Sequence, residues 1–169
     1  VLSKVEGQGK ETLTDDVSIN GSALAQAESS ANRLLFLTEP LKEPVHISGT
    51  PSITIRASSD KQAVNLSVWM VILPWTQGNN FRLNDNLINR GWADLRNSKS
   101  LERSKSLKPE KFYKMTFNLE PDDQIIPAGK QIGLMIFSSD KEFTLWPGPG
   151  TKLTVDLDAT SVTIPIVNP

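Results

Sequence analysis

His46 is the only histidine of the chain, so any Ser-His-Asp site would have to use it. In such a triad the histidine takes the proton of a serine hydroxyl, and the aspartate orients the imidazole ring. No serine lies in a Gly-x-Ser-x-Gly sequence, the turn that exposes this nucleophile between a strand and a helix. We therefore expect His46 to be a structural or surface residue, and we expect no catalytic residue in this chain.

Carboxylates occur in pairs that could begin a cation site: Asp15 with Asp16, Asp122 with Asp123, and Asp156 with Asp158. Ca²⁺ usually takes about six to eight oxygen ligands, which is more than any of these pairs supplies. Cysteine is absent, which excludes thiolate metal sites and disulfides. The sequence thus predicts solvated turns and strand faces at these pairs, with no metal.

Two other patterns could indicate a cofactor or a nucleic acid. Residues 148–152 (Gly-Pro-Gly-Thr-Lys) superficially resemble a phosphate loop, but Pro149 lacks the N–H donor that such a loop needs. Residues 90–114 hold eight basic and three acidic residues, whereas the whole chain has a formal net charge of −1. We expect this stretch to be a solvated excursion or an intramolecular docking patch, and we expect neither a cofactor nor a nucleic-acid partner.

The tryptophans are the more informative candidates. Trp75 and Trp146 each stand beside a proline at the end of an expected strand, where the loops of a sandwich cluster. A tryptophan at such a position can stack on a sugar ring or fill a pocket of a partner domain, and capping of the core is the alternative. We predict Trp75 and Trp146 as domain-contact or ligand-stacking residues. Trp69 is expected in the core, and Trp92 is expected to pack inward.

Residues 64–75 predict the strand around which the other elements are arranged. The first half alternates apolar and polar residues, whereas residues 69–73 are apolar on both faces. This pattern indicates a strand whose second half is covered on both sides, by an opposing sheet and by loops or a partner domain. A second central strand is expected at residues 131–137.

Shorter stretches with turn residues between them predict the other strands: 33–38, 45–48, 51–59, 87–95, 112–119, 152–157 and 161–167. A turn is expected at residues 120–123. Strands at intervals of roughly 10–15 residues without helices between them predict an all-β fold, an antiparallel sandwich or jelly roll. Residues 1–32 are polar and predict a connecting segment that packs on an upstream domain, which leaves residues 33–169 as the sandwich.

Length and composition limit the possible classes of protein. A chain of 169 residues is expected to form one domain. The longest apolar run has eight residues, far below the roughly 20 of a membrane span, and no signal peptide is visible. We therefore expect no membrane association. Because the chain starts without methionine, we expect a piece of a longer polypeptide, although processing or the choice of cloned ends would give the same start.

Five segments follow one another in a specific order: Leu-Phe-Leu-Thr-Glu-Pro-Leu (35–41), Val-x-Ile-Ser-Gly-x-Pro (45–51), Arg-Gly-Trp-Ala-Asp-Leu-Arg (90–96), Ile-Pro-Ala-Gly-Lys-Gln-Ile-Gly-Leu (126–134) and Ser-Ser-Asp (138–140). In this order they resemble the C-terminal domain of the Xaa-Pro dipeptidyl-peptidases. These are α/β-hydrolase serine peptidases whose relatives include cocaine esterase and glutaryl acylases. The family often has a histidine where Lys130 stands, and that residue is not catalytic.

The resemblance implies a jelly-roll, galactose-binding-like sandwich, with the catalytic Ser, Asp and His upstream of this chain. It also implies a cytoplasmic, homodimeric parent that releases N-terminal dipeptides with proline second. The domain would pack on the α/β-hydrolase domain that binds the peptide substrate, and would shape substrate access or assembly. The alternative is a carbohydrate-binding module of a multidomain glycosidase, because the same sandwich can bind glycans. A free-standing esterase is disfavoured because no catalytic constellation is found.

Overall fold

The computed structural model describes residues 7–78, 82–146 and 148–167. Its strands are, in chain order, β1 (Lys10–Thr14), β2 (Leu34–Leu37), β3 (Val45–Gly49), β4 (Ser52–Ser59), β5 (Asn65–Leu73), β6 (Leu87–Asp94), β7 (Tyr113–Asn118), β8 (Asp122–Ile126), β9 (Gln131–Phe137), β10 (Lys152–Asp156), β11 (Ser161–Thr163) and β12 (Ile166–Val167). The helical segments are α1 (Gly21–Gln26) and short 3₁₀ turns at Leu83–Asp85, Leu95–Asn97 and Leu157–Ala159. None of these helices is long and apolar enough to span a bilayer.

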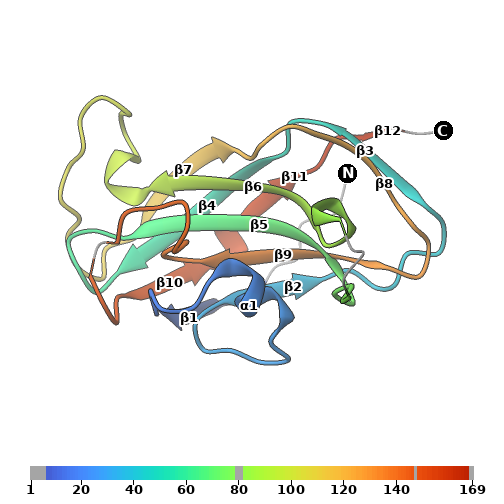
Figure 1. The fold of residues 1–169 in the computed structure, drawn as a ribbon. Helices are drawn as coiled ribbons and strands as arrows, with labels where there is room; N and C mark the ends of the chain where they lie inside the picture. The colour runs from blue at the N-terminus through green and yellow to red at the C-terminus, as the bar shows by residue number, and fades with distance from the viewer. Residues whose placement is uncertain (1–6, 79–81, 147, 168–169) are drawn as a thin grey trace.

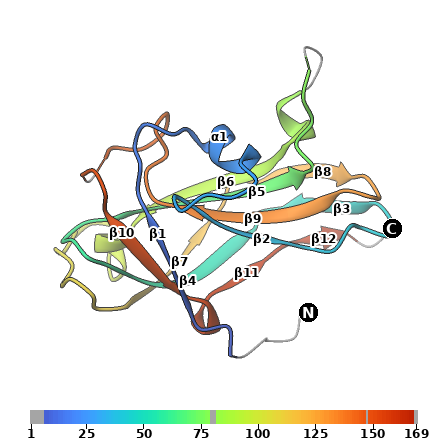
Figure 2. The ribbon, with the colours of Figure 1, turned by 90° about the horizontal axis from the view of Figure 1, so that it is seen from below.

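The strands form two layers, which Figures 1 and 2 show from two directions. One layer is the sheet β2-β9-β5-β6, called here the β5 sheet. The opposing layer holds the sheet β1-β10-β4-β11, with β7 also paired to β4, and the smaller sheet β12-β3-β8. All the strand pairs are antiparallel. The predicted all-β antiparallel sandwich is confirmed.

β5 lies between β9 and β6, so both central strands predicted from the sequence are neighbours in one sheet. Its inner face carries Leu66, Val68, Met70 and Ile72, all of which belong to the main hydrophobic core. The opposing layer contributes buried aliphatic side chains to the same core, among them Ile53, Ile55, Met115, Leu153 and Val155. The period-two alternation of β4 and β5 therefore determines which side chains fill the space between the layers.

The outer face of β5 is covered by the chain's own N-terminal segment. Trp69 and Val71 pack with Leu24 and Ala25 of α1 in a second apolar cluster, and Figure 2 shows α1 on the side of the β5 sheet away from the other layer. Gly21 lies so close to Trp69 that a Cβ there would stand 2.4 Å from the indole ring. The sequence predicted that loops or a partner domain would cover this outer face of β5. In the middle of the sheet, the helix α1 of the same chain covers it.

Residues 7–32, predicted as part of a connecting segment, pack on the sandwich. β1 pairs with β10 along its whole length. The buried Arg33 guanidinium donates to the carbonyls of Leu24 and Ala27 at 2.6 and 2.5 Å, which holds the C-terminal end of α1 against β2. The buried Asp15 carboxylate accepts hydrogen bonds from the Ser139 N–H and hydroxyl at 2.9 and 2.6 Å. A contact of this segment with an upstream domain stays a prediction.

Two local predictions were wrong. Residues 122–126 form β8, which pairs with β3, although residues 120–123 were predicted as a turn. Two adjacent aspartates disfavour a strand locally, but pairing with a neighbouring strand overrides such weak preferences. The strand predicted at residues 161–167 is divided, because Pro165 has no N–H to donate. β11 pairs with β4, whereas β12 pairs with β3 in the smaller sheet.

Candidate functional site

A buried carboxylate organises the loop between β9 and β10. Asp140 follows β9, and its Oδ2 accepts the indole N–H groups of Trp69 and Trp92, both at 2.9 Å. Its side chain is fully buried, and Oδ1 has no hydrogen-bond partner among the residues that the structure describes. Because the two tryptophans come from β5 and β6, Asp140 fixes the beginning of the loop to both strands.

The same residue turns the chain sharply. The Asp140 carbonyl accepts the N–H groups of Phe143 and Thr144 at 2.9 and 2.8 Å, and the Asp140 N–H donates to Thr144 Oγ1 at 3.0 Å. The turn places Phe143 on Trp92, with ring centroids 5.1 Å apart and planes inclined by 22°. Such stacked pairs add to the free energy gained by burial of the rings.

Trp92 therefore faces away from the core, and the prediction that it packs inward was wrong. It lies opposite Ser67 in the register of β5 and β6, on the face that also carries Trp69. The inward position belongs to the preceding residue, Gly91, where a Cβ would stand 2.5 Å from the side chain of Leu119. This close approach of β6 to Leu119 requires a glycine.

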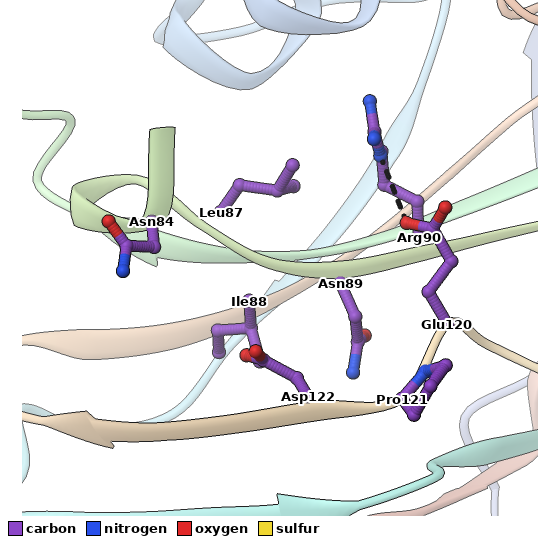
Figure 3. A pocket seen from close by; sticks show the side chains of 8 residues that line it. All are labelled: Asn84, Leu87, Ile88, Asn89, Arg90, Glu120, Pro121 and Asp122. Atoms are coloured by element: carbon purple, nitrogen blue, oxygen red, sulfur yellow. Dashed lines mark hydrogen bonds and ion pairs between the residues drawn. The ribbon is translucent and has the colours of Figure 1, made fainter. Parts of the chain in front are cut away.

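Arg90 lies on the same outer face and is layered over aromatic rings. Its guanidinium carbon is 4.4 Å from the ring centroid of Phe143, 5.4 Å from that of Trp92 and 5.6 Å from that of Trp69. Nε donates to Glu120 Oε2 at 3.4 Å, the contact drawn in Figure 3. The two terminal nitrogens make no hydrogen bond within the described part of the chain. A guanidinium held over aromatic faces keeps its in-plane N–H groups available to an acceptor.

The loop then carries three exposed apolar side chains. Phe143 is 49% exposed, Leu145 is 92% exposed and Trp146 is 55% exposed. The carbonyl of Leu145 accepts a hydrogen bond from the Asn65 side chain, and Figure 1 shows the loop over the start of β5 and the end of β6. We call these side chains, together with those of β6 beneath them, the aromatic–arginine surface: Arg90, Trp92, Phe143, Leu145 and Trp146. It can bind an apolar group and a carboxylate side by side.

A polar cleft lies between β6 and the start of β8, and both Asn89 and Arg90 are among the residues that line it. Figure 3 shows Arg90 and Asn89 pointing to opposite sides of the strand, with Asn89 directed toward β8. The cleft has a volume of about 300 Å³. The buried Asn89 amide has no hydrogen-bond partner in the described residues, and the same holds for Asp122 Oδ2. Burial raises the pKa of Asp122 above its ordinary value. A polar cavity of this size can hold water that satisfies such groups.

His46 has a structural contact on the smaller sheet. Its Nε2 lies 2.6 Å from Asp123 Oδ1 across the β3–β8 pair, and both side chains reach the surface. The hydrogen bond from His46 lowers the pKa of Asp123, and a hydrogen bond from Ser48 acts in the same direction. Within the described ranges, no cluster of three or more His, Cys, Asp and Glu residues could hold a metal ion.

Comparison with known proteins identifies the kind of domain. The family model described as the X-Pro dipeptidyl-peptidase C-terminal non-catalytic domain matches residues 1–167. The chain belongs to this family. A putative Xaa-Pro dipeptidyl-peptidase of Rhodopirellula baltica is 53% identical over 157 residues, which cover 93% of this chain. One of Bacillus cereus is 38% identical over 158 residues, which cover 92% of it. The chain spans only 25% and 26% of the length of these relatives.

Solved structures share the fold of this C-terminal domain. An α-amino acid ester hydrolase superposes with a TM-score of 0.70 and 15% identity, over 96% of this chain and 33% of the hydrolase. An aminopeptidase from a marine sediment archaeon, Thaumarchaeota archaeon, gives a TM-score of 0.71 and 17% identity, over 95% of this chain and 33% of the other. These likenesses confirm the predicted sandwich, and the family match confirms the predicted resemblance.

The structure does not bring Trp75 and Trp146 of this domain together. Trp75 follows the end of β5, is half-buried and packs on the cluster beneath α1. Trp146 lies near the start of β5, where Asn65 bonds to the preceding residue. Their role as domain-contact or ligand-stacking residues stays a prediction, and Trp146 is the more accessible of the two.

The sequence analysis missed Arg90, Asp140 and Phe143 as parts of the site. Arg90 was assigned only to a basic stretch, and Asp140 only to the Ser-Ser-Asp segment. The available signal was the spacing of Arg90 and Trp92, which puts the two side chains on one face of a strand. Asp140 gave no such signal, because its indole partners lie 71 and 48 residues away along the chain.

Proposed function

We propose that this chain is the accessory C-terminal domain of a serine peptidase that releases N-terminal Xaa-Pro dipeptides. The catalytic Ser, Asp and His belong to an α/β-hydrolase domain upstream, on which this domain packs, and the packing shapes substrate access or assembly. The observation that carries the proposal is the match of residues 1–167 to a non-catalytic domain family, in a chain that spans about a quarter of its relatives.

Two features of the structure support an accessory role. His46, the only histidine of the chain, contacts the Asp123 carboxylate through Nε2 on the surface of the smaller sheet. The aromatic–arginine surface combines exposed Phe, Leu and Trp side chains with an arginine, and such residues are enriched in the centres of protein–protein interfaces.

The test compares the full-length polypeptide with a form that lacks this domain. The full-length form should hydrolyse an alanyl-prolyl anilide, and removal of the domain should lower both its thermal stability and its kcat/KM. The 169-residue chain alone should have no activity. An unchanged kcat/KM with unchanged stability after removal would contradict the proposal.

We also propose, from the resemblance alone, that the full-length polypeptide is a cytoplasmic homodimer. Light scattering during size-exclusion chromatography should give twice the mass of one chain, and cell fractionation should place the activity in the cytosol. The mass of a single chain would contradict the homodimer, and activity in the culture medium would contradict the cytoplasmic location.

A further inference from the structure

We propose that the upstream part of the same polypeptide docks on the aromatic–arginine surface and presents a carboxylate to Arg90. This inference rests on the proposed function, because it names the face through which the accessory domain packs. The surface combines the second half of β6 with residues 143–146 of the loop between β9 and β10. It continues the outer face of the β5 sheet beyond the part that α1 covers.

The exposed large aromatic side chains of the described residues are concentrated on this surface. Phe143, Leu145 and Trp146 lie within four residues and are exposed by about half or more of their area. The other exposed large apolar side chains of the described residues are aliphatic: Leu37 and Leu101 lie on separate elements, and Ile125, Ile166 and Val167 lie on the smaller sheet β12-β3-β8. Scattered exposed apolar residues are normal, whereas a contiguous patch with aromatic residues marks an interaction site.

The surface is formed before any partner binds. Asp140 holds the indoles of Trp69 and Trp92, and its main chain forms the turn that positions Phe143. Trp92 is in turn stacked on Phe143. Docking on side chains that are already ordered loses little conformational entropy, which favours a stable interface.

Arg90 determines the charge of the partner. Its side chain is only 17% exposed, and the one hydrogen bond that it makes to described residues, with Glu120, uses Nε at 3.4 Å. Within the described part of the chain, the two terminal nitrogens remain for an acceptor, in the fork geometry that matches a carboxylate. Closing an apolar interface over this guanidinium would leave it with only the long contact of Nε to Glu120, and burying the donors of its terminal nitrogens without an acceptor is unfavourable. We therefore expect the docked surface to bring an Asp or Glu to the terminal nitrogens of Arg90.

The rest of the polypeptide is the occupant that the observations favour. About three quarters of the length of the curated relatives lies outside this chain, so a covalently linked partner is always present. A second copy of this chain is less suitable, because a twofold contact centred on this surface would place two copies of Arg90 near each other. Dimerisation through this face is therefore an outcome that the experiment must be able to detect.

Cysteine reactivity can test the docking face, because these 169 residues contain no cysteine. Leu145→Cys, Leu101→Cys and Ile125→Cys would be introduced separately into the full-length polypeptide. Maleimide modification of each site is followed by peptide mass spectrometry, so cysteines elsewhere do not interfere. Leu101 is the matched control: it is 84% exposed and lies in the excursion between β6 and β7, outside the aromatic–arginine surface.

We expect Leu145→Cys to react about 100-fold more slowly than Leu101→Cys, since an interface must open before the reagent enters. Protection that persists in monomeric full-length polypeptide supports docking within one chain, whereas protection that disappears on dilution to monomers overturns the proposal in favour of a second copy. Fast modification at residue 145 with protection at Ile125→Cys overturns the docking face and leaves the proposed function intact. Fast modification at all three sites overturns the packing that the proposed function requires.

The carboxylate is tested by Arg90→Gln in the Leu145→Cys background. The modification rate should rise by about tenfold or more, because an unpaired partner carboxylate destabilises the docked state. Arg103→Gln, an exposed arginine in the excursion between β6 and β7, should leave the rate unchanged. Ala57→Cys, at a fully buried position, reports unfolding of the domain. If Arg90→Gln makes that site reactive, Arg90→Lys decides, because lysine keeps the positive charge. A modification rate below that of Arg90→Gln supports the pairing, and a rate equal to that of Arg90→Gln overturns it.

Discussion

On the inner face of the β5 sheet, Val68, Met70 and Ile72 are almost completely buried against the opposing layer. On the outer face, Trp69 is covered by α1, whereas Trp92 is only half-buried and Phe143 on top of it is exposed. The inner face is aliphatic and needs no specific geometry beyond close packing. The outer face is aromatic and depends on oriented contacts of indole N–H groups and a guanidinium.

This difference in composition indicates different roles for the inner and the outer face of the β5 sheet. An aliphatic face packed within one chain stabilises the fold and presents nothing to a partner. A face that combines aromatic rings, an arginine layered over them and a preformed loop has the composition of an interface. The sheet thus separates stability and recognition between its two sides, and substitutions on the two sides should have different effects.

Val68→Asp should have the largest effect. The side chain is fully buried on the inner face, so the substitution places an unpaired charge in the core. The expected loss is several kcal/mol, against a total stability of about 5–15 kcal/mol, so the domain should unfold. Urea unfolding measures the effect, with Val167→Asp at an exposed position as the control. A soluble Val68→Asp variant with an unchanged melting temperature would show that the inner face is misassigned.

Asp140→Ala should disturb the outer face without unfolding the chain. It leaves the indole N–H groups of Trp69 and Trp92 without an acceptor and releases the loop. Loss of two such bonds should lower the free energy of unfolding by about 3 kcal/mol. Tryptophan fluorescence should also change, whereas the exposed Asp16→Ala should leave the spectrum as it is. A stability loss below that of Asp16→Ala would mean that Asp140 does not organise the surface.

Gly21→Ala tests the covered half of the outer face. The new methyl group would stand 2.4 Å from the ring of Trp69, so α1 must move outward. Overpacking of this kind lowers stability by about 1–3 kcal/mol. Ser22→Ala, in the same turn of α1, is the control and should change little. Equal stability of Gly21→Ala and Ser22→Ala would show that α1 does not pack tightly on β5.

Asp122→Asn should give the smallest effect, and a stabilising one. Because burial raises the pKa of Asp122, the folded state binds this proton more tightly than the unfolded state. The charged form therefore destabilises the fold above the folded-state pKa, and the penalty disappears as the pH falls below the ordinary value. Asp122→Asn should be the more stable protein at neutral pH, and the advantage should vanish in acid.

Asp123→Asn is the control for this prediction, because its expected change in stability has the opposite sign. The hydrogen bond from His46 lowers the pKa of Asp123, so its charged form stabilises the fold above the ordinary pKa, and this contribution is lost as the pH falls through the folded-state pKa. Asp123→Asn should therefore destabilise slightly at neutral pH. Urea unfolding at several pH values compares both variants, and equal signs would contradict the assignment of Asp122 to the cleft.

Much of the fold could be predicted because apolar and polar residues alternate along its strands with a period of two residues. The alternation in β4 and β5 identifies the inner face, and the apolar second half of β5 indicates a cover on both sides. β8 could not be predicted, because its strand conformation comes from pairing with β3 rather than from its own residues. The division of residues 161–167 into two strands could have been predicted, since Pro165 signals a break in strand pairing.

Of the residues of the candidate site, only Trp146 was predicted from the sequence as a contact residue. The direction of Trp92 depends on the register with β5, which no local pattern specifies. The roles of Asp140 and Arg90 depend on contacts between segments that are distant in the chain. Residues 7–32 looked like a linker because their few large apolar side chains are widely spaced, although Leu13 enters the main core and Leu24 packs on Trp69.

The structure of the full-length polypeptide would test the central claim most directly, through the distance from the terminal nitrogens of Arg90 to the nearest carboxylate oxygen outside this chain. The account predicts that this distance is a hydrogen-bond length, about 2.7–3.2 Å, and that Leu145 and Trp146 are buried by the upstream part. Leu145 and Trp146 in solvent, with Arg90 facing only water, would contradict it.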